Sequence, residues 1–181
     1  MKRNSESILT EWLVINSQLG DAKALEQLLH LWYPKLSRYA LKLIGEDNLA
    51  KDATQDALLD LCKGIHKIDD PAAFPKWVYR IIQHKCADAI KQLQKERTKT
   101  QVLEVMHQTE LSHQKEMTDE AELDLSCLDS NAYQLVYLHY YEEFSFAEIS
   151  HIVELPVGTL KSRLFTIRQK LKLTNKGQDH E

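Results

Sequence analysis

Apolar residues recur at spacings of three and four along almost the whole chain, and no segment alternates apolar and polar residues long enough to predict a strand. The pattern therefore predicts an all-α protein. Pro34 should kink the second helix or restart it, because proline removes a backbone donor. The apolar stripes lie at residues 8–19, 25–32, 36–44, 49–65, 78–93, 128–141, 146–153 and 160–171. The residues expected to separate and cap these helices are Gly20, Asp21, Gly45, and Asp47 or Asn48.

The segment 145–173 predicts a short capped helix, a tight turn and a longer basic helix. Ser145 and Glu148 form a capping box, in which the serine side chain bonds a free backbone N–H and the glutamate bonds back to the cap residue. Pro156 fits the start of the second helix, where its missing N–H costs nothing. Two helices held at an angle, with the second basic and facing outward, form an arrangement that the major groove of DNA admits.

The charges in this segment favour DNA binding over a plain helical bundle, which has the same pattern of helices. No acidic residue follows Pro156 before Asp179, and the neutralisation of phosphates requires such an excess of cations. The net charge of -4 does not oppose this, because residues 101–130 hold 1 Lys or Arg against 8 Asp or Glu. The cations after Pro156 are Lys161, Arg163, Arg168, Lys170, Lys172 and Lys176.

Two small helical domains account for the 181 residues. The first is expected to span residues 1–97 and to contain an ordered, exposed loop at 66–75, where an Asp-Pro turn signal precedes a second proline. A polar, acidic linker at 98–124 has too few large apolar residues to fold alone and should be helical in part at most. The second domain, at 125–181, carries the helix-turn-helix.

Composition argues against several classes of protein. No apolar run approaches the ~18 residues of a membrane span, and no leader resembles a signal peptide, so a cytoplasmic location is expected. Cys62, Cys86 and Cys127 form no C-x-x-C pair, and the 8 histidines lack ligand spacing. We therefore predict no disulfide framework, no metal site and no cofactor. The absence of a glycine-rich phosphate loop and of a nucleophile elbow argues against an enzyme with a small-molecule substrate.

Four short segments match the patterns of one protein family. Residues 50–56 read AKDATQD, similar to A-x-D-x-x-Q-(D/E), and residues 74–81 read FPKWVYRI, similar to F-x-x-W-L-Y-R-I. Residues 147–149 read AEI, and residues 156–164 read PVGTLKSRL, similar to P-x-G-T-V-K-S-R-L. In this order and at these separations, the segments resemble the extracytoplasmic-function (ECF) group of bacterial RNA polymerase sigma factors, within the sigma-70 family.

The resemblance implies a promoter-specificity subunit that has no chemistry of its own. Such a sigma factor binds core RNA polymerase, through the clamp helices of the largest subunit and the flap. It directs promoter-specific transcription initiation by recognising the −10 and −35 elements of promoter DNA and by assisting strand opening. The family also implies an anti-sigma factor as an inhibitor, which the sequence does not identify.

The resemblance also assigns sites by position. Core-polymerase binding falls to Asn48, Asp52, Gln55, Asp56 and Leu59. The −10 element falls to the loop and to the helix expected at about 76–95, at Asp70, Phe74, Trp77, Arg80, His84 and Lys91. The −35 element falls to Thr159, Lys161, Ser162, Arg163 and Arg168, with at least half of the contacts expected to reach phosphates.

Two of these assignments have structural alternatives. The core-binding residues also fit an ordinary solvated helix face, and Trp77 also fits a half-buried core residue, because a large ring is seldom fully buried.

Glu154 departs from the family, which prefers glycine at this corner of the helix-turn-helix. If φ is positive there, the side chain costs ~1 kcal/mol.

A second function competes with the first. An autonomous helix-turn-helix regulator would use its N-terminal domain to sense a ligand or to dimerise, and its C-terminal domain to bind operators. Paired half-sites on the DNA would identify it, whereas a sigma factor needs core enzyme and two unlike elements at a fixed spacing.

Overall fold

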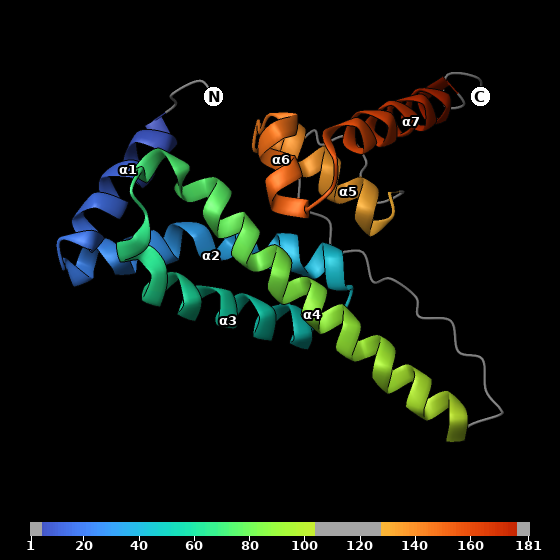
Figure 1. Ribbon diagram of the computed structural model, residues 1–181, viewed down its shortest axis with the longest axis horizontal. Coiled ribbons are helices and arrows are strands. Elements are labelled where there is room, and N and C mark those ends of the chain that lie inside the picture. The colour runs from blue at the N-terminus through green and yellow to red at the C-terminus, as the bar shows by residue number, and fades with distance from the viewer. Residues whose placement is uncertain (1–4, 104–127, 177–181) are drawn as a thin grey trace.

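The computed structural model describes residues 5–103 and 128–176, and these ranges contain helices and turns but no strand, which confirms the all-α prediction. In these two ranges, seven α-helices are joined in places by shorter helical turns (Figure 1). The α-helices are α1 (Ser5–Gln18), α2 (Ala22–Ile44), α3 (Asp47–Gly64), α4 (Phe74–Leu103), α5 (Ser130–Val136), α6 (Phe146–Val153) and α7 (Val157–Lys176). The shorter turns are the 3-10 helices η1 (Ile65–Lys67) and η2 (Pro71–Ala73) and the π-helical turn η4 (Tyr137–Tyr141).

Helices α1 to α4 form the first part of the molecule. Helix α2 packs against α1, α3 and α4, and the C-terminal end of α4 extends beyond the other helices (Figure 1). Burial of the apolar stripes holds these helices together, at roughly 25 cal/mol for each Å² of apolar surface removed from water. The largest fully buried aliphatic side chains of this part are Leu13, Leu28, Leu36, Leu61, Ile65 and Ile82.

Most of the helix caps that the sequence predicts are present in the structure. The carboxylate of Asp21 accepts hydrogen bonds from the backbone N–H groups of residues 23 and 24, at 2.9 and 3.3 Å, and so caps α2. Gly45 ends α2 at φ 75°, a conformation that glycine adopts without steric cost. The prediction of Asp47 or Asn48 as the cap of α3 is wrong by one residue. Glu46 has the extended backbone of a cap, and its carboxylate accepts from the N–H groups of residues 48 and 49.

The expected restart at Pro34 is also wrong, because α2 continues through this residue as one helix. Pro34 is exposed, while Trp32 and Leu36 on either side are buried. The buried stripe therefore runs past the proline without a change of period. Burial of these side chains against α1, α3 and α4 offsets the one missing backbone hydrogen bond.

Helix α4 runs past the expected end near Lys95 to Leu103. The first residues of the predicted linker are thus helical, and the rest of that linker, residues 104–124, lies outside the described residues. The expected loop at 66–75 is ordered by η1 and η2, and residues 66, 67, 69 and 70 are exposed.

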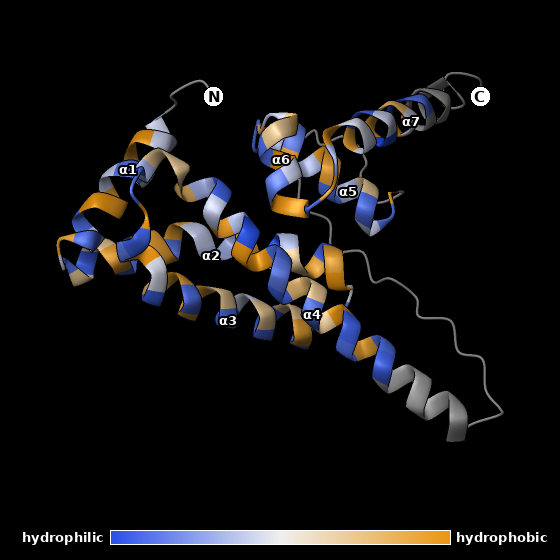
Figure 2. Cartoon of the chain, in the orientation of Figure 1, coloured by the Kyte–Doolittle hydropathy of each residue, from blue (hydrophilic) through white to orange (hydrophobic). Residues whose placement is uncertain are grey.

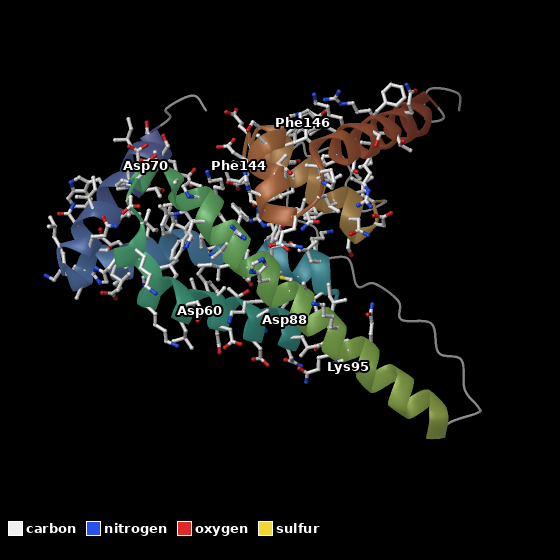
Figure 3. The ribbon with its side chains drawn as sticks, viewed as in Figure 1. Asp60, Asp70, Asp88, Lys95, Phe144 and Phe146 are labelled. Carbon is white, nitrogen blue, oxygen red and sulfur yellow. The ribbon has the colours of Figure 1, made fainter. Side chains whose placement is uncertain are left out.

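Helix α5 packs against α2 and α6 packs against α4, while α7 packs on α5 and α6, so that one continuous core joins the two parts of the molecule. Tyr79 of α4 lies at the centre of this contact. Its ring meets those of Tyr39, Tyr137 and Phe144 with centroids 5.2, 6.1 and 5.8 Å away, and Phe144 lies where α6 faces α4 (Figure 3). The Tyr79 hydroxyl donates a 2.8 Å hydrogen bond to Glu142, and burial raises the pKa of this hydroxyl well above its ordinary value.

The two cysteines in the described ranges differ in burial, which gives a labelling prediction. Cys86 is buried in α4, and burial raises the pKa of its thiol to about 12, whereas Cys62 is partly exposed. Alkylation requires the thiolate, and at pH 8 a thiol with that pKa is ionised in about one molecule in ten thousand. We expect iodoacetamide at pH 8 to label Cys62 and to spare Cys86 until urea unfolds the chain. Mass spectrometry of a Cys127→Ser variant measures this, and equal labelling rates would contradict the buried position of Cys86.

Candidate nucleic-acid and protein interfaces

The outward side of α3 presents the five residues assigned to core-polymerase binding. The opposite side of the helix is buried and consists mostly of small residues, which lets α3 pack closely on α2 and α4. Leu59 is 56% exposed and adds an apolar group to this otherwise polar side of the helix. The exposed set is Asn48, Asp52, Gln55, Asp56 and Leu59.

The residues assigned to the −10 element do not all reach the surface. Phe74 is 0% exposed and packs edge-on against Trp32, with ring centroids 5.3 Å apart. Its assignment to the DNA surface is therefore wrong. The first turn of α4 points Phe74 into the core, where an aromatic ring removes a large apolar area from water.

Trp77 is half-buried, which fits the alternative that the sequence left open. Its six-membered ring covers Gly64 at the end of α3, and a Cβ at residue 64 would fall 2.8 Å from Cζ2 of Trp77. The absence of a side chain at Gly64 thus lets the ring approach the α3 backbone. Only the outer edge of this tryptophan remains available to a partner.

The remaining −10 residues are exposed at η2 and along α4. The carboxylate of Asp70 caps η2 by accepting a 3.0 Å hydrogen bond from the N–H of Ala72, and Lys91 lies 3.8 Å from Asp88.

Arg80 and His84, one turn apart, both face Glu154 at the corner of the helix-turn-helix. The distances from Oε1 of Glu154 are 3.5 Å to Nη2 of Arg80 and 3.2 Å to Nε2 of His84.

The helix-turn-helix has the local geometry that its sequence predicts. The Ser145 N–H donates to Oε2 of Glu148 at 2.9 Å, and the Glu148 N–H donates to Oγ of Ser145 at 3.3 Å, which completes the capping box. Glu154 ends α6 at φ 55°, in the left-handed region. Glu143, just before α6, has φ 54°, a second left-handed position that was not predicted from the sequence.

The two strained glutamates give a matched stability prediction. Glycine at either site should relieve about 1 kcal/mol of backbone strain. Glu154→Gly also removes the exposed contacts to Arg80 and His84, which contribute about 0–1 kcal/mol. We therefore expect Glu143→Gly to raise the free energy of unfolding by about 1 kcal/mol, and Glu154→Gly by less. Urea denaturation compares them, and a larger gain for Glu154→Gly would show that the ion pairs do not stabilise this arrangement.

Helix α7 has one buried and one exposed side, and it carries both hydrophobic and hydrophilic residues (Figure 2). Leu160, Leu164 and Ile167 are buried against α5 and α6. Of the residues assigned to the −35 element, Thr159 is partly exposed and the others are exposed: Lys161, Ser162, Arg163 and Arg168.

One exposed residue of this surface was not assigned from the sequence. Phe165 is 62% exposed on α7, between cationic and hydroxyl side chains. The sequence contains a signal for this residue, because Phe165 is an aromatic residue that lies outside the apolar stripe of its amphipathic helix. Such a ring suits an apolar contact with the methyl group of thymine in the major groove.

The described residues contain neither a membrane-spanning helix nor a cluster of metal ligands. No helix in residues 5–103 or 128–176 has both the length and the apolar character required to cross a membrane. In the same ranges, no three His, Cys, Asp or Glu side chains are grouped so that they could hold a metal ion.

These features define a helical protein with a helix-turn-helix, an exposed basic helix and a second exposed polar helix face. The family model for Sigma-70 region 2 matches residues 28–96, and that for Sigma-70, region 4 matches residues 125–171. The two matches together cover more than half of the chain.

Curated relatives match over most of their length. The ECF RNA polymerase sigma factor SigM of Bacillus subtilis is 25% identical over 162 residues, which cover 87% of this chain and 99% of SigM. SigW of the same organism is 24% identical, over 84% of this chain and 89% of SigW. The chain belongs to the sigma-70 family of RNA polymerase sigma factors, in the ECF group.

Solved structures share the fold. The sigma factor RpoE of Bartonella quintana, in complex with the anti-sigma factor NepR, superposes with a TM-score of 0.65 at 20% identity, over 86% of this chain and 98% of that one. CnrH in complex with the cytosolic domain of CnrY gives a TM-score of 0.60 at 18% identity, over 93% of this chain and 98% of that one.

Proposed function

We propose that this chain, as an ECF sigma factor, uses the exposed side of α3 to bind core RNA polymerase, α4 to engage the −10 element and α7 to engage the −35 element. Family membership carries the general function, which is promoter-specific transcription initiation with core polymerase. The residue roles rest on position and exposure. We further propose that the chain acts in the cytoplasm and catalyses no reaction itself.

The observation that best supports the DNA-binding role is the outward placement of the cations of α7. Lys161, Arg163 and Arg168 are exposed, while Leu160, Leu164 and Ile167 on the other side of the helix are buried. A helix with this division can lie in the major groove and neutralise phosphates without losing contact with its own core. Inward-facing cations on α7 would have excluded this role.

The −10 role rests on the exposed side of α4. Arg80, His84 and Lys91 follow one another at helical spacing on that side, with the exposed edge of Trp77 one turn before Arg80. Cations suit a single-stranded backbone, and an aromatic edge suits a base that has left the stack. Phe74 has no part in this proposal, because it is buried.

The autonomous regulator is not favoured. Its N-terminal domain would sense a ligand or dimerise, whereas residues 28–96 match the Sigma-70 region 2 model. Curated sigma factors also align with the chain over nearly their whole length. The neighbouring structures of RpoE and CnrH were solved with bound partners, NepR and the cytosolic domain of CnrY. We therefore propose an anti-sigma factor as a further partner of this chain.

Run-off transcription tests the function directly. Purified core polymerase should initiate at specific promoters on genomic fragments when this protein is added, and not without it. If core polymerase gains no specific initiation and the protein alone binds a palindrome tightly, the chain is an autonomous regulator instead.

A further inference from the structure

Two cations of α7 lie over aromatic rings of the preceding segment. His139 and Tyr140 belong to η4, and Phe146 begins α6. We call these three side chains the aromatic ledge. Lys161 and Arg168 stand seven residues apart on α7, which places them two turns apart on one side of the helix.

The ledge is a connected row of rings. The His139 ring lies 4.8 Å from the Phe146 ring and 4.9 Å from the Tyr140 ring, between centroids. Nδ1 of His139 lies 3.1 Å from the carbonyl oxygen of Phe144, which ties the row to the turn before α6. Phe146 lies between α6 and the first turns of α7 (Figure 3).

Each cation has its own ring. Nζ of Lys161 lies 5.8 Å from the centroid of the Phe146 ring, within the range of a cation–π interaction. The guanidinium of Arg168 lies 5.5 Å from the centroid of the Tyr140 ring, and its Nε also donates a hydrogen bond to the Tyr140 hydroxyl. Arg168 therefore has a two-point contact with Tyr140.

We infer that the aromatic ledge positions Lys161 and Arg168 for DNA, with Tyr140 as the main positioning residue. This inference rests on the proposed function of α7. A flexible side chain loses rotamer freedom when it binds, and a contact that restricts it beforehand reduces that loss. The ledge would restrict both side chains before DNA arrives.

The chemistry of the ledge suits this role better than an acidic partner would. A carboxylate would neutralise the cation and compete with phosphate, whereas an aromatic ring or a neutral hydroxyl leaves the positive charge intact. The bond from Nε of Arg168 to Tyr140 leaves the two terminal nitrogens of the guanidinium for DNA. Those nitrogens can bind a phosphate, or the N7 and O6 of guanine, in a bidentate manner.

The first test observes Arg168 in the full chain without DNA, by NMR of its Nε–H group. We expect a ring-current shift from Tyr140 and slow exchange with solvent. Tyr140→Phe should keep the ring-current shift and lose the slow exchange, and Tyr140→Leu should lose both. Tyr33→Leu, at a tyrosine that is 39% exposed on α2, is the matched control and should change neither. An Arg168 signal that is the same in all these proteins would overturn the inference.

The second test is a double-mutant cycle on the affinity of the full chain, bound to core polymerase, for a duplex that carries the −35 element. Tyr140→Leu should weaken binding by about threefold to tenfold, and Tyr140→Phe by less. In an Arg168→Ala background, Tyr140→Leu should have little further effect, because its role passes through Arg168. Equal losses in both backgrounds would show that Tyr140 is only structural.

The outcomes also separate this inference from the proposed function. If Arg168→Ala does not change the affinity, the DNA contact of Arg168 is wrong and the inference falls with it. Run-off transcription by the unaltered protein would still decide whether the chain is a sigma factor.

Discussion

Truncation of Tyr79 to alanine is expected to lower the free energy of unfolding by about 3–5 kcal/mol, the range for loss of a large aromatic side chain from a core. Tyr79 is fully buried where α4 meets α2, η4 and the turn before α6. The substitution would leave a cavity lined by Trp32, Tyr39 and Phe144. It would also remove the hydrogen bond that the Tyr79 hydroxyl donates to Glu142.

Two variants separate the ring from the hydroxyl. Tyr79→Phe keeps the ring but removes the bond to Glu142 and the contact with the hydroxyl of Tyr137, 3.2 Å away. It should cost about 1–2 kcal/mol. Tyr33→Ala, at an exposed tyrosine, should change stability by at most about 0.5 kcal/mol. Urea denaturation followed by circular dichroism measures all three, and similar losses for Tyr79→Ala and Tyr33→Ala would mean that the two parts do not share this core.

The second large effect concerns core-polymerase binding. The double variant Asp52→Ala with Gln55→Ala should weaken association with core polymerase by about tenfold or more, because both side chains lie at the centre of the exposed side of α3. Its affinity for −35 DNA should be unchanged. Arg163→Ala should do the reverse, with about tenfold weaker binding to the −35 element and normal association with polymerase.

A matched control uses another exposed acid and amide. Glu26→Ala with Gln27→Ala removes the same kinds of exposed groups from α2, outside the two assigned surfaces, and should leave both activities intact. Fluorescence anisotropy with labelled core polymerase and with labelled duplex measures the two affinities. Unchanged polymerase affinity in the Asp52/Gln55 variant would remove the docking assignment. Loss of both activities in Arg163→Ala would show that Arg163 supports the fold.

Features that depend on neighbouring residues could be predicted from the sequence. The capping box of Ser145 and Glu148, the cap at Asp21 and the left-handed Gly45 each involve bonds or torsion angles within a few residues. The exposed side of α7 followed in the same way, because helical period fixes which residues share a side. The outward positions of Lys161 and Arg168 could therefore be predicted from the sequence.

The predictions for Pro34 and Phe74 were wrong because contacts with distant segments outweigh the local preference of the chain. Pro34 does not interrupt α2, because the helix on both sides of it is buried by α1, α3 and α4. Phe74 belongs to a motif assigned to DNA, yet it packs against Trp32, 42 positions earlier in the chain. The shift of the α3 cap from Asp47 to Glu46 has a more local cause, since three acidic or amide residues in a row can each fill that role.

The sequence by itself determined the helices, most of their ends, the sigma-factor motifs and the polar surfaces of α3 and α7, because these depend on short-range bonds and on a fixed helical period. The tertiary structure alone decided that Phe74 is core and that Glu154 faces Arg80 and His84. It also decided that Tyr140 holds Arg168. These contacts join residues 28 to 74 positions apart, and their formation depends on how whole helices pack, which no local pattern of residues encodes.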